Sequence, residues 1–174
     1  MKNIFYILLL ISSALLAISC SDDDNDTIDK SAPTIDISGS DFQNCTVVTK
    51  GIPFTFTAKI SDNEALGSYN FNIHHNFDLH THSTEAEVVE CETGEKKEAT
   101  NPFKLVKAFT IPDSPKTFTI KETFTIPEEY EAGNYHFMIT VVDKAGWSKV
   151  KGLSFKVVDK EEEKKRNKVR KRLK

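Results

Sequence analysis

Residues 133–143 read Gly-Asn-Tyr-His-Phe-Met-Ile-Thr-Val-Val-Asp, and this stretch decides the fold class. From Tyr135 to Ile139 every second side chain is aromatic or aliphatic, so in an extended chain these side chains share one face. A turn at residues 144–147 follows, and residues 149–158 have the composition of another strand. The pattern therefore predicts two consecutive strands joined by a short turn.

The same alternation recurs through the middle of the chain, separated by turns rich in Pro, Gly, Asp and Asn. Further strands are expected at residues 32–37, 52–60, 68–75, 86–91, 103–111 and 117–126. Glu122 falls on the apolar face of the last of these, which predicts a bulge or a strand end there. Because no stretch of this region has helical periodicity, the sequence predicts an all-β fold.

The pattern Gly-x-Tyr-x-Phe-x-Ile-x-Val-x-Asp, followed by Ala-Gly-Trp, resembles the last two strands of bacterial immunoglobulin-like domains. Tyr135 stands where their tyrosine corner would lie. The resemblance implies an immunoglobulin-like β-sandwich of about seven strands over residues 32–159.

The first 19 residues are expected to be a lipoprotein signal peptide. Lys2 precedes a continuous apolar run at residues 4–11, and small residues lie before Cys20. The segment Leu-Ala-Ile-Ser-Cys at residues 16–20 resembles a bacterial lipobox, which implies that Cys20 is the lipidated N-terminus of the mature chain. The alternative is an ordinary signal peptide followed by a chance cysteine.

Residues 20–31 are expected to be an acidic tether, because residues 21–26 contain four Asp and no apolar side chain. This run resembles the export signal of Bacteroidota-type lipoproteins. The resemblance implies an outer membrane lipoprotein that faces the extracellular side, and the alternative is a hydrophilic spacer in the periplasm. Asp-Thr-Ile at residues 26–28 also resembles the O-glycosylation site of those bacteria, with Thr27 as the acceptor.

Two cysteines remain once Cys20 is assigned to lipid. In an oxidising compartment the pair Cys45 and Cys91 is expected to form a disulfide. The competing interpretation is a thiolate metal site, although neither cysteine belongs to a Cys-x-x-Cys pattern.

Four of the five histidines lie within residues 74–82. Imidazole is a common ligand for zinc and copper, so this cluster predicts a transition-metal site. If the strands at residues 68–75 and 133–143 are antiparallel neighbours, His74 and His136 lie side by side on the outward face.

The loop histidines His80 and His82 then need only fold back over that face to complete the site. The predicted metal ligands are therefore His74, His80, His82 and His136. Two further residues are candidates for supporting roles. His75 is the substitute ligand if the strand carries a bulge, and Asp78 is an oxygen ligand or a hydrogen-bond acceptor for a ligating ring.

Two other interpretations of the histidines are open. In the first, the rings only hydrogen-bond to Asp78, Thr81 and backbone groups in a polar loop. In the second, the cluster responds to pH, because nearby imidazoles resist becoming charged together.

With the lipobox and the acidic run, the core His-His-x-Phe-Asp-x-His-x-His resembles a Bacteroidota surface lipoprotein domain family of unknown function. The expected function is a noncatalytic, lipid-anchored binding module with a zinc or copper site. The alternative is a carbohydrate- or protein-binding accessory lipoprotein of a nutrient-uptake system without metal, in which Trp147, Tyr69 or Tyr135 would stack on a glycan.

An enzyme is not expected, because the sequence has no Gly-x-Ser-x-Gly pattern and no phosphate-binding glycine loop. A remote alternative is a metal-dependent phosphoesterase. Residues 78–83 resemble the first motif of the polymerase-and-histidinol-phosphatase superfamily, but those enzymes need further ligands on a large α/β barrel.

The chain ends in a charged tail at residues 160–174, which contains nine basic and three acidic residues. A segment of this composition is expected to be disordered or weakly helical. It is expected to be a solvated tail without a partner, and the alternative is that it pairs with lipid phosphates at an outer-membrane surface. Nucleic acid is not an expected partner, because secretion separates the protein from it.

Overall fold

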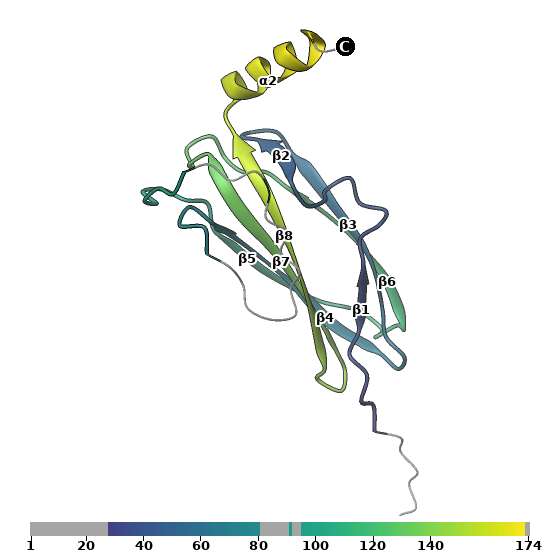
Figure 1. Ribbon diagram of the computed structural model, residues 1–174. Coiled ribbons are helices and arrows are strands. Elements are labelled where there is room, and N and C mark those ends of the chain that lie inside the picture. Colours follow the sequence, from purple (N-terminus) through teal and green to yellow (C-terminus); the bar gives the residue numbers. More distant parts are fainter. Residues whose placement is uncertain (1–27, 81–90, 92–94, 173–174) are drawn as a thin grey trace, which may run out of the picture.

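The computed structural model describes residues 28–80, 91 and 95–172, and its strands form two sheets that face each other (Figure 1). The predictions for Cys20, Thr27 and His82 concern residues outside these ranges. The strand expected at residues 86–91 also lies outside them, apart from Cys91. The all-β sandwich predicted from the alternating pattern is confirmed.

One sheet has three antiparallel strands in the order β1-β3-β6. These are β1 (Thr34–Asp36), β3 (Phe54–Ser61) and β6 (Thr117–Phe124). On β3 alternate side chains are buried, as the sequence pattern predicted.

The other sheet has five strands in the order β2-β8-β7-β4-β5. These are β2 (Thr46–Thr49), β8 (Ser148–Val158), β7 (Gly133–Asp143), β4 (Leu66–His75) and β5 (Leu105–Thr110). All pairs are antiparallel except β2 with β8, which is parallel. The sequence analysis did not predict β2.

Aromatic side chains fill the space between the sheets. Phe137 of β7 is fully buried, and its ring centroid lies 4.8 Å from that of Phe56 on the opposite sheet. Three further rings pack around Phe137 at centroid distances of 5.1 to 5.5 Å: Phe42, Phe71 and Phe124. This aromatic core fixes the inner face of β7 and therefore the outward face on which His136 lies.

The structure has no bulge near Glu122, and β6 ends two residues later, at Phe124. The β3–β6 register runs without interruption from Phe54 opposite Phe124 to Ser61 opposite Thr117. The Glu122 carboxylate instead accepts hydrogen bonds from the Tyr69 hydroxyl at 3.4 Å and from Lys107 Nζ at 3.5 Å. Because these donors satisfy the carboxylate, the strand can keep Glu122 in a half-buried position without breaking its register.

A disulfide joins Cys45 and Cys91, whose Cα atoms are 5.2 Å apart. This confirms the predicted pair. Next to β2, the Cys45 amide donates to the Ser154 carbonyl of β8 at 2.7 Å. The disulfide thus connects the edge of the five-stranded sheet to the segment that follows the histidine loop in the sequence.

The charged tail forms a helix, α2 (Lys160–Arg172), that extends from the end of β8 (Figure 1). None of its residues is buried. Acidic side chains occupy its first turn and basic side chains its last turn, which matches the helix dipole and stabilises the helix. The first turn also forms ion pairs with the sandwich, from Lys160 to Glu128 and from Glu162 to Lys156. In the described part of the chain, no helix combines the length and the apolar character needed to cross a membrane.

Candidate metal centre

The register of the five-stranded sheet places two of the predicted ligands together. His74, near the end of β4, is directly opposite His136, near the start of β7. Their ring centroids are 5.5 Å apart, with the ring planes at 83°. The adjacency follows from the antiparallel pairing, which brings the end of one strand beside the start of the other.

A turn after β4 brings a third histidine over the same face. The Asn76 amide donates to the Asn134 carbonyl at 2.7 Å, and the buried Phe77 ring packs edge-on against Tyr135 at 5.3 Å. Leu79 then takes a left-handed conformation with φ of 55°, which turns the chain back. These contacts position His80 above the outer surface of the sheet.

His80 completes a compact group of three imidazoles. Its ring stacks on that of His74 at a centroid distance of 5.6 Å and meets the His136 ring edge-on at 5.1 Å. One ring nitrogen from each of His74, His80 and His136 lies within 4.8 Å of the other two. We refer to these three residues as the histidine triad.

Hydrogen bonds orient two of the rings. His74 Nδ1 lies 2.9 Å from Asn72 Oδ1, and His80 Nδ1 lies 2.7 Å from Asp78 Oδ1. A proton on each Nδ1 satisfies these acceptors and places the ring lone pair on Nε2, where a metal ion can bind it. The hydrogen bond from His80 lowers the pKa of Asp78 below its ordinary value, so this carboxylate stays charged beside the ring.

Asn72 was not among the predicted site residues, although a sequence signal for it exists. It lies two positions before His74 in β4 and therefore on the same face of the strand. Asp78 and His80 repeat the spacing of an oxygen acceptor two residues before a histidine. The repeated spacing identifies the acceptors that orient the ligands.

Burial within the histidine triad is uneven. His136 is only 1% exposed, whereas His74 and His80 are partly exposed. His136 lies on the outer face of the sheet, and the other two rings lie against it. A metal ion in the triad would therefore reach solvent on the side of His74 and His80.

The remaining predicted residues are not in the triad. His75 pairs in register with Tyr135 on the inner side of the strand end, and its ring packs against Phe77 at 5.0 Å. The only irregularity in the β4–β7 register lies at the far end of β4, so it does not shift His75 toward the outer face. His82 lies outside the described residues.

Of the three aromatic residues that were candidates for glycan stacking, two are buried and one is exposed. Tyr69 and Tyr135 are 6% and 0% exposed, so neither presents a ring face to solvent. Tyr135 instead donates its hydroxyl hydrogen to the Glu131 carbonyl at 2.7 Å and accepts from the Phe103 amide at 3.2 Å. Trp147 is 47% exposed, and its indole N–H donates to the Asp29 carbonyl at 2.9 Å.

The family model described as "Domain of unknown function (DUF4625)" matches residues 18–158. It covers the whole sandwich and the histidine triad. No match to this sequence exists among curated proteins.

Solved structures with a similar arrangement of strands come from several bacteria. A DUF4466 family protein from Parabacteroides merdae is 14% identical, with a TM-score of 0.45 over 73% of this chain and 45% of that chain. A variant of the SrpA adhesin from Streptococcus sanguinis is 14% identical, with a TM-score of 0.43 over 78% of this chain and 60% of that chain.

Wild-type OgpA from Akkermansia muciniphila is 8% identical, with a TM-score of 0.42 over 74% of this chain and 30% of that chain. The chain thus spans between 30% and 60% of the length of these three structures. At such low identity and structural overlap, no functional argument follows from them.

Proposed function

We propose that this chain, which belongs to the DUF4625 family of domains of unknown function, is a noncatalytic binding module whose histidine triad binds a transition-metal ion. The observation that carries the proposal is the approach of three ring nitrogens to within 4.8 Å, from two paired strands and the loop that follows one of them. Such a set of imidazoles suits Zn²⁺ or Cu²⁺.

Hydrogen bonds to two of the histidine rings also support a metal site. Two of the rings have oxygen acceptors at Nδ1, which is the arrangement that orients metal-binding histidines and raises their basicity. The Asp78 carboxylate also adds negative charge beside the site, which favours a bound cation. The His80–Asp78 bond is also expected in a polar loop, so the observation that favours a metal site is the convergence of the three ring nitrogens.

The coordination expected for zinc is tetrahedral, with nitrogens at about 2.0 to 2.1 Å from the metal. The histidine triad supplies three ligands. His82 follows His80 by two residues in the sequence and is the candidate for a fourth nitrogen; it lies outside the described residues. The remaining position would otherwise be taken by water or by a ligand from a binding partner.

We also propose that the sandwich is immunoglobulin-like and that the protein is a surface lipoprotein. The strand order supports the fold assignment, because β2 pairs in parallel with the last strand while β1 pairs with the other sheet. The backbone hydrogen bond of Tyr135 resembles a tyrosine corner. Anchoring through Cys20 rests on the lipobox-like sequence and the acidic residues after it.

The proposed metal site is tested by calorimetric titration of the chelator-treated full chain, in detergent, with Zn²⁺ and Cu²⁺. We expect tight binding of one ion per chain. His136→Asn, which replaces a proposed ligand on the paired strands, should weaken metal binding by at least about tenfold. His80→Asn, in the loop, should have the same effect.

The matched control is His75→Asn, which removes a neighbouring imidazole that faces the other side of the strand. The affinity of this variant for Zn²⁺ and Cu²⁺ should equal that of the wild type. Equal binding by wild type and His136→Asn would contradict the proposed site, and so would the absence of binding by the wild-type chain.

A further inference from the structure

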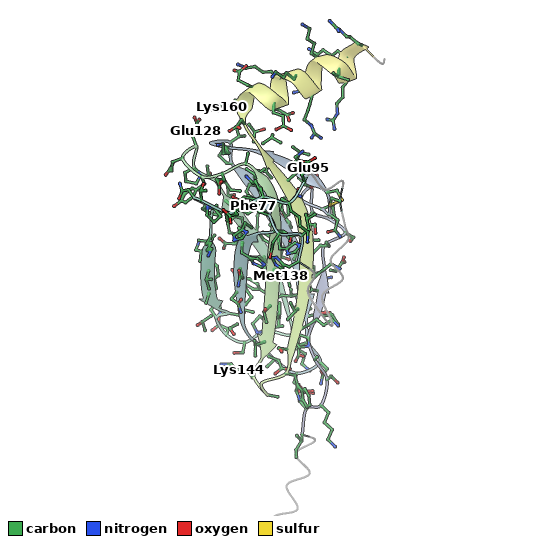
Figure 2. All side chains as sticks on the ribbon, turned by 60° about the vertical axis from the view of Figure 1, so that its left-hand side comes forward. Phe77, Glu95, Glu128, Met138, Lys144 and Lys160 are labelled. Atoms are coloured by element: carbon green, nitrogen blue, oxygen red, sulfur yellow. A yellow bond between two sulfur atoms is a disulfide. The ribbon has the colours of Figure 1, made fainter. Side chains whose placement is uncertain are left out.

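Three aspartates meet at the end of the sandwich opposite helix α2. Asp29 precedes β1, Asp62 follows β3 directly, and Asp143 is the last residue of β7. Lys144, the neighbour of Asp143, marks this end in Figure 2, and the N-terminal part of the chain reaches the sandwich here (Figures 1 and 2). We refer to these three residues as the aspartate triad.

The three carboxylates converge. One carboxylate oxygen of each residue lies within 4.8 Å of the corresponding oxygens of the other two. At this separation three negative charges repel one another strongly, and the repulsion grows as water is removed. A cation bound between them would relieve this repulsion.

Each carboxylate is held in place through its Oδ1 atom. Asp62 Oδ1 accepts from the Glu64 and Ala65 amides at 2.9 and 2.8 Å. Asp143 Oδ1 accepts from the Trp147 amide at 2.8 Å. Asp29 Oδ1 accepts from the Ser31 amide and from Asn63 Nδ2, both at 3.0 Å.

The three Oδ2 atoms are buried and have no hydrogen-bond partner among the described residues. Asp62 and Asp143 are themselves only 9% and 5% exposed. Burial of a carboxylate oxygen without a donor is costly, and a cation bound among the three carboxylates would remove this cost.

The nearby lysine does not supply this charge. Lys116 Nζ donates to the Asn63 carbonyl at 2.6 Å and lies 3.9 Å from the Glu64 carboxylate, on the outside of the turn. None of the ion pairs formed by the described residues includes Asp29, Asp62 or Asp143.

We propose that the aspartate triad binds a calcium ion. Carboxylate oxygens are hard ligands, and Ca²⁺ accepts six to eight oxygens in flexible geometry, so three carboxylates leave room for water and backbone carbonyls. The donors differ in kind from the imidazoles of the histidine triad, and the two sites therefore select different metals.

Calcium at this position would connect three segments that are distant in sequence. Asp29 belongs to the segment that leads into β1, Asp62 follows β3, and Asp143 is the last residue of β7. The Trp147 indole already links these parts through the Asp29 carbonyl. The bound ion would fix the point at which the N-terminal segment joins the sandwich.

Terbium luminescence gives a local test, because Tb³⁺ occupies calcium sites and is sensitised by a nearby indole. Trp147 is the single tryptophan of the chain and contacts two members of the aspartate triad. With the chelator-treated full chain in detergent, we expect tryptophan-sensitised Tb³⁺ emission that Ca²⁺ displaces. Trp147→Phe should abolish the tryptophan-sensitised emission.

Asp62→Asn and Asp143→Asn test the ligands. Asparagine retains the Oδ1 acceptor and the side-chain size but removes the charge, and each change should weaken Ca²⁺ binding at least about tenfold from a dissociation constant on the order of 10⁻⁴ M. The matched control is Asp113→Asn, an exposed aspartate in the β5–β6 turn with φ of 57°, which asparagine also tolerates. This control should bind Ca²⁺ as the wild type does.

Thermal unfolding distinguishes ion binding by the aspartate triad from a purely structural role of these three residues. In Ca²⁺ the wild type should be stabilised by roughly 5 °C, and the two triad variants should lose this shift. In chelator the variants should be at least as stable as the wild type, because a repulsive charge is gone. The proposal is overturned if wild type does not bind millimolar Ca²⁺, if the variants bind it equally well, or if they are equally destabilised with and without Ca²⁺.

Discussion

His74 lies directly opposite His136 across the antiparallel strands β4 and β7, and their ring centroids are 5.5 Å apart. Two of the proposed metal ligands are therefore fixed by sheet register, and the third, His80, comes from the loop after β4. Sites on paired strands need little rearrangement to bind an ion. The loop ligand His80 therefore depends on the Asp78 contact to orient its ring.

Asp78→Asn should weaken zinc binding by about tenfold while leaving the fold intact, because the charged acceptor of the His80 ring is lost. Calorimetric titration of the full chain measures the change. Asp113→Asn, which removes an equivalent charge from a distant exposed turn, is the control and should not alter the affinity. An Asp78→Asn affinity equal to that of the control would show that this carboxylate does not orient the loop ligand.

Metal removal should affect the two proposed sites independently. Zinc should raise the midpoint of thermal unfolding by a few degrees, and a chelator should reverse the shift, because an ion that binds only the folded chain stabilises it. His136→Asn should lose the zinc shift but keep the calcium shift, and Asp143→Asn should do the opposite. Loss of both shifts in either variant would mean that the two sites are coupled or that the variant disturbs the whole sandwich.

Removal of the Cys45–Cys91 disulfide should lower the free energy of unfolding by about 4 kcal/mol, because the bond closes a loop with a sequence separation of 46. The double variant Cys45→Ser/Cys91→Ser, unfolded in urea, measures the loss. Reduction of the wild type should cause the same loss. An unchanged urea midpoint in both experiments would contradict a stabilising disulfide.

Two buried tyrosines should make the fold sensitive to alkali. Burial raises the pKa of Tyr135 to about 12, and burial together with the Glu122 carboxylate raises that of Tyr69 to about 12. The folded chain therefore keeps protons that the unfolded chain releases above its ordinary tyrosine pKa of about 10. Their contribution is complete below about pH 10 and is lost as the pH rises through about 12.

The comparison of Tyr135→Phe with Tyr69→Phe tests this prediction through urea unfolding at several pH values. Each variant should show a smaller loss of stability between about pH 10 and 12 than the wild type. At neutral pH, Tyr135→Phe should cost about 1 to 3 kcal/mol, since the Phe103 amide loses its acceptor and the Glu131 carbonyl its donor. If the stability of Tyr135→Phe fell as steeply as that of the wild type between about pH 10 and 12, this would contradict the raised pKa of Tyr135.

The alternating pattern was sufficient to predict most of the fold, because a half-buried strand must place its apolar side chains at every second position. Tyr135, Phe137 and Ile139 are all fully buried, as their spacing indicated. β2 was missed because four residues with adjacent valines show no clear alternation, and its parallel partner β8 is about 100 residues away in the sequence. The bulge at Glu122 was predicted wrongly because the hydrogen-bond donors to its carboxylate, Tyr69 and Lys107, come from other strands.

The candidate sites differ in how visible they are in the sequence. His74 and His80 attract attention because histidines are rare and clustered, and strand pairing then leads to His136. The aspartate triad was missed because each member lies alone near a strand end, where aspartate is common for reasons of turn structure. Only the fold shows that the segment before β1 and two turns meet at one point.

X-ray absorption at the zinc edge measures which atoms surround zinc bound to the purified full chain. We expect at least three imidazole nitrogens at about 2.0 to 2.1 Å in the wild type, and one fewer in His136→Asn. An identical spectrum for His136→Asn, or zinc surrounded only by oxygen in the wild type, would contradict a metal centre built on His74, His80 and His136.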